Sequence, residues 1–138
     1  MKSFFLFLWQ LPQTILAHIV LLVCKIKFGK SNVKKVDPNE VVKGIKNVYS
    51  VPKFFNSCVS LNVIIGQENR VKRPKAIMHE FGHRKQSQML GPLYLLIIGL
   101  PSFLGNQYSR LCRKRGKKFD YYKQPWEAWA DKLGGVKR

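Results

Sequence analysis

The feature that most constrains the fold of this chain is the sequence His79-Glu80-Phe81-Gly82-His83, an H-E-x-x-H pattern. On an α-helix, residues four positions apart lie one above the other on the same face. If this segment is helical, His79 and His83 can direct their imidazole nitrogens toward one metal ion. Glu80 then lies beside that face, where its carboxylate can take a proton from water without binding the metal. The alternative is that both histidines are ordinary surface residues.

The residues around the motif favour a helix that contains it. Pro74 suits the first turn of a helix, and the pair Gly91-Pro92 stops one. The sequence therefore predicts a helix from about Pro74 to about Leu90. Gly82 inside this helix costs about 1 kcal/mol relative to alanine. A glycine there indicates the close approach of another backbone or of a substrate, and crowding by a neighbouring helix explains it equally well.

A catalytic zinc ion needs a third protein ligand and one open position. The pattern H-E-x-x-H-x-x-G-x-x-H does not supply that ligand, because Gln86 and Met89 occupy the places of its glycine and its third histidine. His18, the other histidine, lies in an apolar N-terminal segment. A better candidate is Glu127, which follows Pro125, a residue that can begin a second helix. The alternative for Glu127 is an acid of the first turn, favoured by the helix dipole.

Asp131 lies four residues after Glu127 and therefore on the same face of this second helix. Histidines that bind a metal usually donate their second N–H to a carboxylate, and Asp131 is placed to accept that bond from His79 or His83. The alternative is a surface acid paired with a neighbouring lysine. Acids are scarce in this chain, with 7 Asp and Glu against 25 Lys and Arg, so their gathering in two short helices favours a site.

With these residues the chain resembles the gluzincin type of zinc metallopeptidase, which includes thermolysin-like enzymes and membrane-bound peptidases related to the CAAX-processing protease. The resemblance covers the H-E-x-x-H helix and the E-x-x-x-D helix that follows it. It implies one Zn²⁺ per chain held by His79, His83 and Glu127, with Glu80 as general base and Asp131 supporting a ligand. The chain also resembles small bacterial membrane-associated proteins of the H-E-x-G-H type, a likeness that carries no assigned substrate.

The resemblance implies hydrolysis of peptide bonds in a peptide or protein substrate. The metal ion would polarise the carbonyl, while Glu80 activates water and passes its proton to the leaving amine. Tyr121 or Tyr122, just before the second helix, is a candidate donor to the oxyanion. One competing interpretation is a non-catalytic membrane protein with a structural or degenerate zinc site, but a structural site needs a fourth ligand. The three cysteines are far apart and indicate a reducing compartment rather than a metal cluster.

The resemblance also implies a strand beside the motif helix. The segment Ser57–Gly66 is rich in β-branched residues and alternates apolar with smaller or polar residues, so we expect one strand there. It is either an edge that pairs with peptide or a plain core strand. A second short strand is expected at Val48–Val51, and a basic turn at Asn69–Arg73. These elements predict a single α+β domain over residues 1–138, mostly α, with a zincin-like catalytic region at 36–138.

The second constraining feature is an uncharged apolar segment at residues 3–24. About 20 such residues suffice to cross a bilayer. Lysines follow at once between Lys25 and Lys35, and such a cluster favours a cytoplasmic location for the C-terminal side. We therefore expect a membrane protein, in the bacterial inner membrane, whose site faces the cytoplasm. Because polar residues are unfavourable in lipid, Gln10–Gln13 can instead divide the segment into two short helices in or on the membrane. A buried helical hairpin is the other alternative.

A further apolar run, residues 89–104, follows the motif helix. It is short for a membrane span, so we expect a re-entrant or interfacial helix, with a core helix as the alternative. The formal charge of +18 comes largely from basic runs at Lys25–Lys35, Arg70–Lys75 and Arg110–Lys118. Basic runs beside apolar segments favour an anionic membrane surface as partner. Nucleic acid is the competing partner for this charge, and a basic nucleic-acid-binding protein the competing function, but no recognition motif supports them.

Overall fold

The computed structural model describes residues 2–37, 42, 45, 47–52 and 58–138. The helices are α1 (Lys2–Trp9), α2 (Leu11–Phe28), α3 (Glu68–Val71), α4 (Pro74–Leu90), α5 (Leu100–Lys114) and α6 (Pro125–Gly134). Short 3-10 turns lie at Lys30–Asn32, Gly91–Leu93 and Tyr121–Lys123, and a π-helical turn at Leu95–Gly99. The strands are β1 (Lys34–Val36), β2 (Val48–Val51), β3 (Cys58–Ser60) and β4 (Ile64–Gln67). The predicted α+β fold, mostly α, is confirmed.

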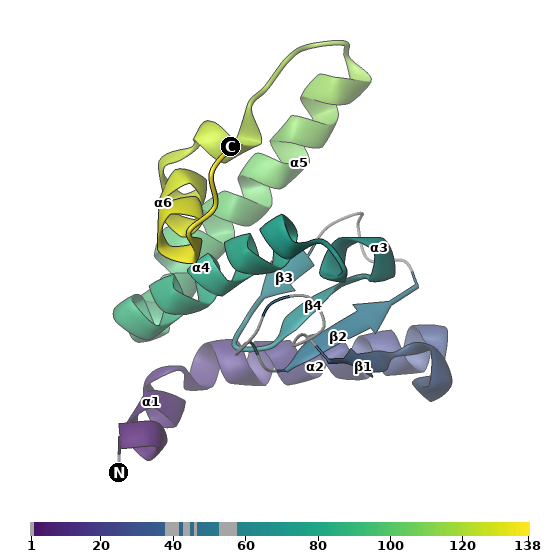
Figure 1. Cartoon of the computed structure of the whole chain (residues 1–138), viewed down its shortest axis with the longest axis vertical. Helices are drawn as coiled ribbons and strands as arrows, with labels where there is room; N and C mark the ends of the chain where they lie inside the picture. Colours follow the sequence, from purple (N-terminus) through teal and green to yellow (C-terminus); the bar gives the residue numbers. More distant parts are fainter. Residues whose placement is uncertain (1, 38–41, 43–44, 46, 53–57) are drawn as a thin grey trace.

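The four strands form one mixed sheet in the order β1-β2-β4-β3 (Figure 1). β2 and β4 run parallel, whereas β1 and β3 are antiparallel to their neighbours. The prediction of a strand at Val48–Val51 is confirmed. The prediction of one continuous strand at Ser57–Gly66 is wrong in its described part, because the chain reverses at Asn62 and forms the β3–β4 hairpin. Asn62 adopts the left-handed conformation, with φ of 66°, which asparagine tolerates better than most residues.

The sheet lies between α2 on one face and α3 with α4 on the other (Figure 1). Adjacent residues of β4 point to opposite faces, as the two-residue period of a strand requires. Ile65 packs with Ala17 and Leu21 of α2, and Ile64 packs with Ile77 of α4. The sequence predicts a basic turn at residues 69–73. The structure has the one-turn helix α3 at Glu68–Val71, and Lys72 and Arg73 then lead into α4. Both faces of this small sheet are therefore buried, and α2 covers one of them.

The motif helix α4 has the predicted bounds, and the second predicted helix begins at Pro125. The backbones of α4 and α6 touch at two glycines. A Cβ added at Gly82 would lie 1.9 Å from the carbonyl oxygen of Ala130, and one at Gly134 would lie 2.1 Å from that of Met78. Of the explanations that the sequence left open for Gly82, the structure therefore supports crowding by a neighbouring helix.

The N-terminal apolar segment is divided at Gln10, as the polar residues there allowed, so a single helix over residues 3–24 is not formed. The amides of Gln10 and Gln13 both donate to the hydroxyl of Ser87 on α4, at 3.2 and 3.1 Å. Gln13 also donates to the carbonyl of Gly91 at 2.5 Å. These buried bonds pair the amide nitrogens of both glutamines, which lipid would leave unpaired. In the described part of the chain, α2 is the one helix long and apolar enough to cross a membrane.

The apolar run at 89–104 is not a separate helix. It comprises the last turn of α4, the two short turns after it and the first turn of α5, which continues to Lys114. Tyr94 and Ile98 point into the core that α2 covers, whereas most of the large side chains between them and beyond them are exposed. The run is thus core on one side and exposed on the other.

Candidate metal centre

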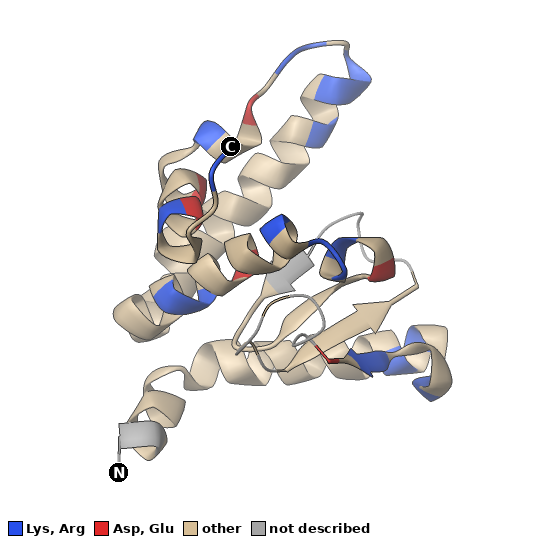
Figure 2. Ribbon diagram, viewed as in Figure 1, with Lys and Arg blue, Asp and Glu red and all other residues tan. Residues whose placement is uncertain are grey.

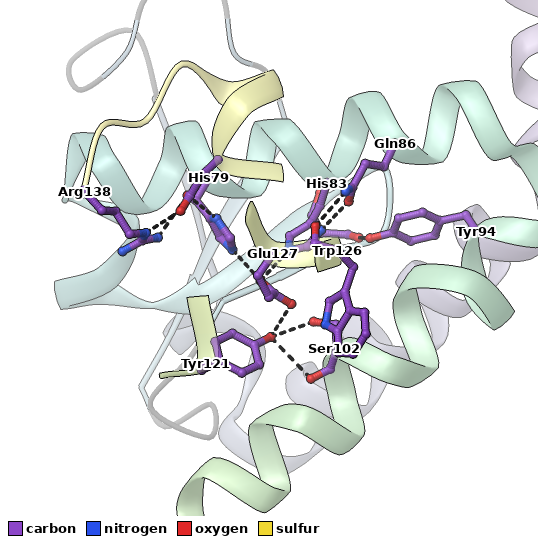
Figure 3. A network of polar contacts seen from close by, with 11 residues as sticks. His79, His83, Gln86, Tyr94, Ser102, Tyr121, Trp126, Glu127 and Arg138 are labelled. Carbon is purple, nitrogen blue, oxygen red and sulfur yellow. Dashed lines mark hydrogen bonds and ion pairs between the residues drawn. The ribbon is translucent and has the colours of Figure 1, made fainter. Parts of the chain in front are cut away.

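Three side chains from α4 and α6 converge on one point in the interior. His79 Nε2 lies 3.0 Å from Glu127 Oε2, and His83 Nε2 lies 3.2 Å from the same oxygen (Figure 3). Both histidines are 5% exposed and Glu127 is fully buried. The close approach of α4 and α6 at Gly82 produces this convergence, because it brings the first turns of α6 against the histidine face of α4. The structure therefore places the three predicted ligands together.

The spacing of these atoms fits a metal ion. Ligands at about 2.0–2.1 Å from a tetrahedral ion lie roughly 3.3 Å from one another. The two nitrogen–oxygen distances, 3.0 and 3.2 Å, are close to that value. The ligand atoms of His79, His83 and Glu127 all lie within 4.8 Å of one another. Among the described residues, these three are the His, Cys, Asp or Glu side chains that could share one metal ion. The cluster could hold a metal ion with at least one coordination position left for water or substrate.

The Nδ1 atom of each histidine, which points away from the cluster, donates a hydrogen bond to a buried acceptor. His79 Nδ1 donates to Asp131 Oδ1 at 2.7 Å. His83 Nδ1 donates to Gln86 Oε1 at 2.7 Å, because the Gln86 amide nitrogen is itself engaged with the carbonyl of Trp126 at 2.8 Å. Both rings are thereby fixed with a proton on Nδ1 and with Nε2 directed at Glu127. A metal ion that binds there takes the place of any proton on Nε2. The sequence placed Asp131 beside one of the two histidines, and the structure assigns it to His79.

Asp131 is in turn held by Arg138. The guanidinium donates to both carboxylate oxygens, through Nε at 2.5 Å and through Nη2 at 3.1 Å. The same guanidinium lies 3.3 Å above the ring of Tyr122, whose edge meets the ring of His79 at a centroid distance of 5.4 Å. Tyr122 thus packs beside a candidate ligand, and whether it reaches an oxyanion stays a prediction.

The second oxygen of Glu127 is held by Tyr121. The Tyr121 hydroxyl donates to Glu127 Oε1 at 2.6 Å, and the Ser102 hydroxyl of α5 lies 2.7 Å from the Tyr121 oxygen. Because the tyrosine proton is directed at Glu127, Ser102 is the donor in that second bond. These two hydrogen bonds hold the Glu127 carboxylate so that its Oε2 atom faces the histidines. The role of Tyr121 as an oxyanion donor also stays a prediction.

The charges of the cluster depend on one another. Burial lowers the pKa of His79, but the hydrogen bond to Glu127 and the charges of Glu80 and Glu127 outweigh it and raise that pKa to about 9. Burial raises the pKa of Glu127, but the hydrogen bonds from His79 and His83 hold it well below its usual range. Without a metal, the proton on His79 balances the negative charges of Glu80 and Glu127. A bound metal cation would take over that role.

Glu80 differs from the other acids of the site. The residue is 7% exposed, and within the described part of the chain the structure records no hydrogen bond to its carboxylate. Burial raises the pKa of Glu80, an effect opposed by the charges of His79 and His83. A buried carboxylate that lies next to the cluster, with no donor among the described residues, can exchange a proton with a neighbouring molecule.

Sequence reasoning missed three supporting residues. Gln86 lies three positions after His83 on the same helix, a spacing that could have identified it. Ser102 and Arg138 reach the cluster only through the packing of α5 and the segment after α6, and no local pattern marks them. His18 is exposed on α2, where its Nδ1 lies 2.7 Å from the carbonyl oxygen of Thr14. No match to this chain was found among models of protein families, curated proteins or solved structures.

Proposed function

We propose that this chain is a membrane-associated zinc-dependent metallopeptidase that hydrolyses peptide bonds. The observation that supports it most is the convergence of His79, His83 and Glu127 on one buried point, with the Glu80 carboxylate beside them. Two imidazoles and one carboxylate are the ligands of known catalytic zinc sites, which keep a fourth position for water or substrate. A structural site would be closed by a fourth protein ligand, and the described residues offer none.

A zinc ion held by these residues would supply a Lewis acid that polarises the scissile carbonyl and lowers the pKa of water to about 7. Glu80 takes the proton of the attacking water on its carboxylate and returns it to the leaving amine. Burial raises the pKa of Glu80, which favours its acceptance of that proton. Asp131 and Gln86 accept hydrogen bonds from Nδ1 of the two histidines, which aims both Nε2 atoms at the metal position.

The sheet supplies a place for an extended substrate. β3 is an edge strand, and it packs beside α4. The Tyr94 hydroxyl donates to the carbonyl of Ser60 at 3.2 Å, which ties the end of β3 to the segment after α4. An extended peptide can pair with the free edge of such a strand through its main chain. Because β3 packs beside α4, a peptide bound there would lie next to the helix that carries both histidines.

The proposal is tested by the substitution Glu80→Gln in the full-length protein, purified in detergent. Glu80 is not a ligand, so the variant should retain about one zinc per chain by metal analysis but lose cleavage of an unstructured protein substrate by at least about 100-fold. Glu68→Gln is the matched control, because it makes the same chemical change at an exposed position on α3. Wild-type cleavage by Glu80→Gln, or a wild-type protein without bound zinc, would contradict the proposed mechanism.

A further inference from the structure

A large part of the surface consists of exposed apolar side chains, which we call the apolar face. It comprises Phe4, Phe5, Leu6, Phe7, Leu8 and Trp9 of α1; Ile15, Leu16, Ile19, Leu22, Val23 and Ile26 of α2; and Leu93, Leu96, Ile97, Leu100, Phe103, Leu104, Tyr108 and Leu111 before and on α5. Each of these residues is between 38% and 76% exposed. Apolar patches of such extent are rare on soluble monomers and mark contact with a membrane or another protein.

The apolar face is continuous from one helix to the next. The ring of Trp9 packs against Gly91 so closely that a Cβ there would lie 2.1 Å from it. Gln13 bonds the carbonyl of the same glycine. The inner sides of α2 and of the segment Tyr94–Ile98 share one core cluster. Since these elements adjoin and their inner sides are buried together, their outer sides form one surface.

The packing of α2 on the sheet excludes a membrane-crossing orientation for that helix. Ala17, Leu21 and Cys24 of α2 lie in one cluster with Val51 of β2 and Ile65 of β4, so the sheet covers the inner side of α2 from Ala17 to Cys24. If α2 crossed a bilayer, the sheet and its edges would enter the hydrocarbon, where unpaired backbone groups cannot be satisfied. α2 can therefore contact lipid only with its outer side, while lying along the membrane.

Basic residues gather at the carboxyl ends of α2 and α5, the two longest helices that contribute to the apolar face (Figure 2). One group begins in the last turn of α2 and continues into β1: Lys25, Lys27, Lys30, Lys34 and Lys35. The other ends α5: Arg113, Lys114, Arg115, Lys117 and Lys118. Three members of the second group line an open hollow of about 420 Å³ together with Ser109, Phe119 and Asp120. An apolar surface bordered by cations is complementary to a layer of acyl chains under anionic headgroups.

We infer that the apolar face docks into one leaflet of an anionic lipid bilayer, with α2 lying along the leaflet and both basic groups among the headgroups. The chain then binds the membrane from one side, and its N-terminus stays on the side of the C-terminus. Ser102, which supports the Tyr121–Glu127 bond, belongs to the same α5 that carries part of the apolar face. If the proposed function holds, on which this consequence rests, the substrate is a polypeptide segment at the membrane surface.

The orientation is tested with the full chain carrying one peptide tag ahead of Met1 and another after Arg138. Protease added to sealed inside-out membrane vesicles should remove both tags, because both ends lie on the cytoplasmic side. Protection of the N-terminal tag alone would show that the N-terminal region crosses the bilayer, and would overturn the inference. The result is independent of zinc and of peptidase activity.

The surface itself is tested by flotation of purified protein with lipid vesicles. Ile19→Glu on α2 and Phe103→Glu on α5 each place a charge on the apolar face at a side chain more than half exposed, so the fold should tolerate them. Each should lower binding to phosphatidylglycerol vesicles by about tenfold or more, since one large apolar contact with lipid is lost. Asn69→Glu, an exposed position on α3 across the sheet from α2, is the control and should bind like wild type.

Salt and zinc content complete the test. Raised salt should reduce the preference for anionic over zwitterionic vesicles but not abolish binding, because apolar insertion is not screened. Zinc content equal to wild type shows that a variant has folded, and also keeps the membrane inference separate from the proposed function. A full-length protein that stays soluble without detergent as a dimer, and does not float with vesicles, would assign the apolar face to a second copy of the chain.

Discussion

Replacing Gly82 with alanine should destroy the metal centre without changing any of its ligands. The added Cβ would lie 1.9 Å from the carbonyl oxygen of Ala130, whereas an ordinary contact needs about 3.4 Å. α6 would therefore have to move away from α4 by roughly 1.5 Å. Glu127 is on α6 and both histidines are on α4, so the movement acts directly on the distances between the ligands. Zinc sites tolerate deviations of only about 0.2 Å.

Metal analysis after dialysis, together with a thermal unfolding curve, measures this effect. Gly82→Ala should retain far less than one zinc per chain and should lose about 1–3 kcal/mol of stability through overpacking. Gly99→Ala is the control, because its Cβ would meet its nearest neighbour at 3.6 Å and its φ of −59° suits any residue. If Gly82→Ala binds zinc with wild-type affinity and melts like wild type, the contact between α4 and α6 does not set the geometry of the site.

The remaining predictions concern the groups around the ligands. Asp131→Asn should lower zinc affinity by about 10–100-fold in a chelator competition, and Glu127→Ala should lower it further; the reverse order would make Asp131 the ligand. Gln86→Leu should also weaken zinc binding by about tenfold, since it leaves Nδ1 of His83 without its acceptor; unchanged affinity would show that this bond is not needed. Because the pKa of His79 is raised from 6.5 to about 9, its proton stabilises chelator-treated protein most below pH 6.5, and this contribution should be lost as the pH rises through about 9. Zinc competes with that proton, so zinc affinity should rise over the same interval, and a flat pH profile in either measurement would contradict the assignment.

The sequence identified the local elements of the site because their signals are local. The spacing of His79 and His83, together with Pro74 and Gly91, predicted α4 with its observed bounds. Pro125 marked the beginning of α6. These signals work because a helix is closed by bonds between residues four apart, so a short stretch of sequence contains the information.

The alternating apolar pattern at 57–66 was less informative. A two-residue period is the same in one long strand and in two strands joined by a tight turn. The left-handed conformation of Asn62 separates β3 from β4. Asparagine is favoured in turns, but the apolar alternation on both sides of this single residue hid that signal. The apolar segment at 3–24 was ambiguous for a similar reason, because lipid and a protein core favour the same side chains.

By itself, the sequence determined which residues could bind a metal and on which helices they lie. Only the tertiary structure decided that Asp131 supports His79 and that Gln86, held by the carbonyl of Trp126, supports His83. It also brought Ser102 and Arg138 to the site. It also decided that α2 covers a sheet, where the sequence alone fitted a membrane span. Backbone geometry within a helix is fixed by neighbours in the chain, whereas contacts between helices and the sheet depend on how distant surfaces fit together, and no short stretch of sequence carries that information.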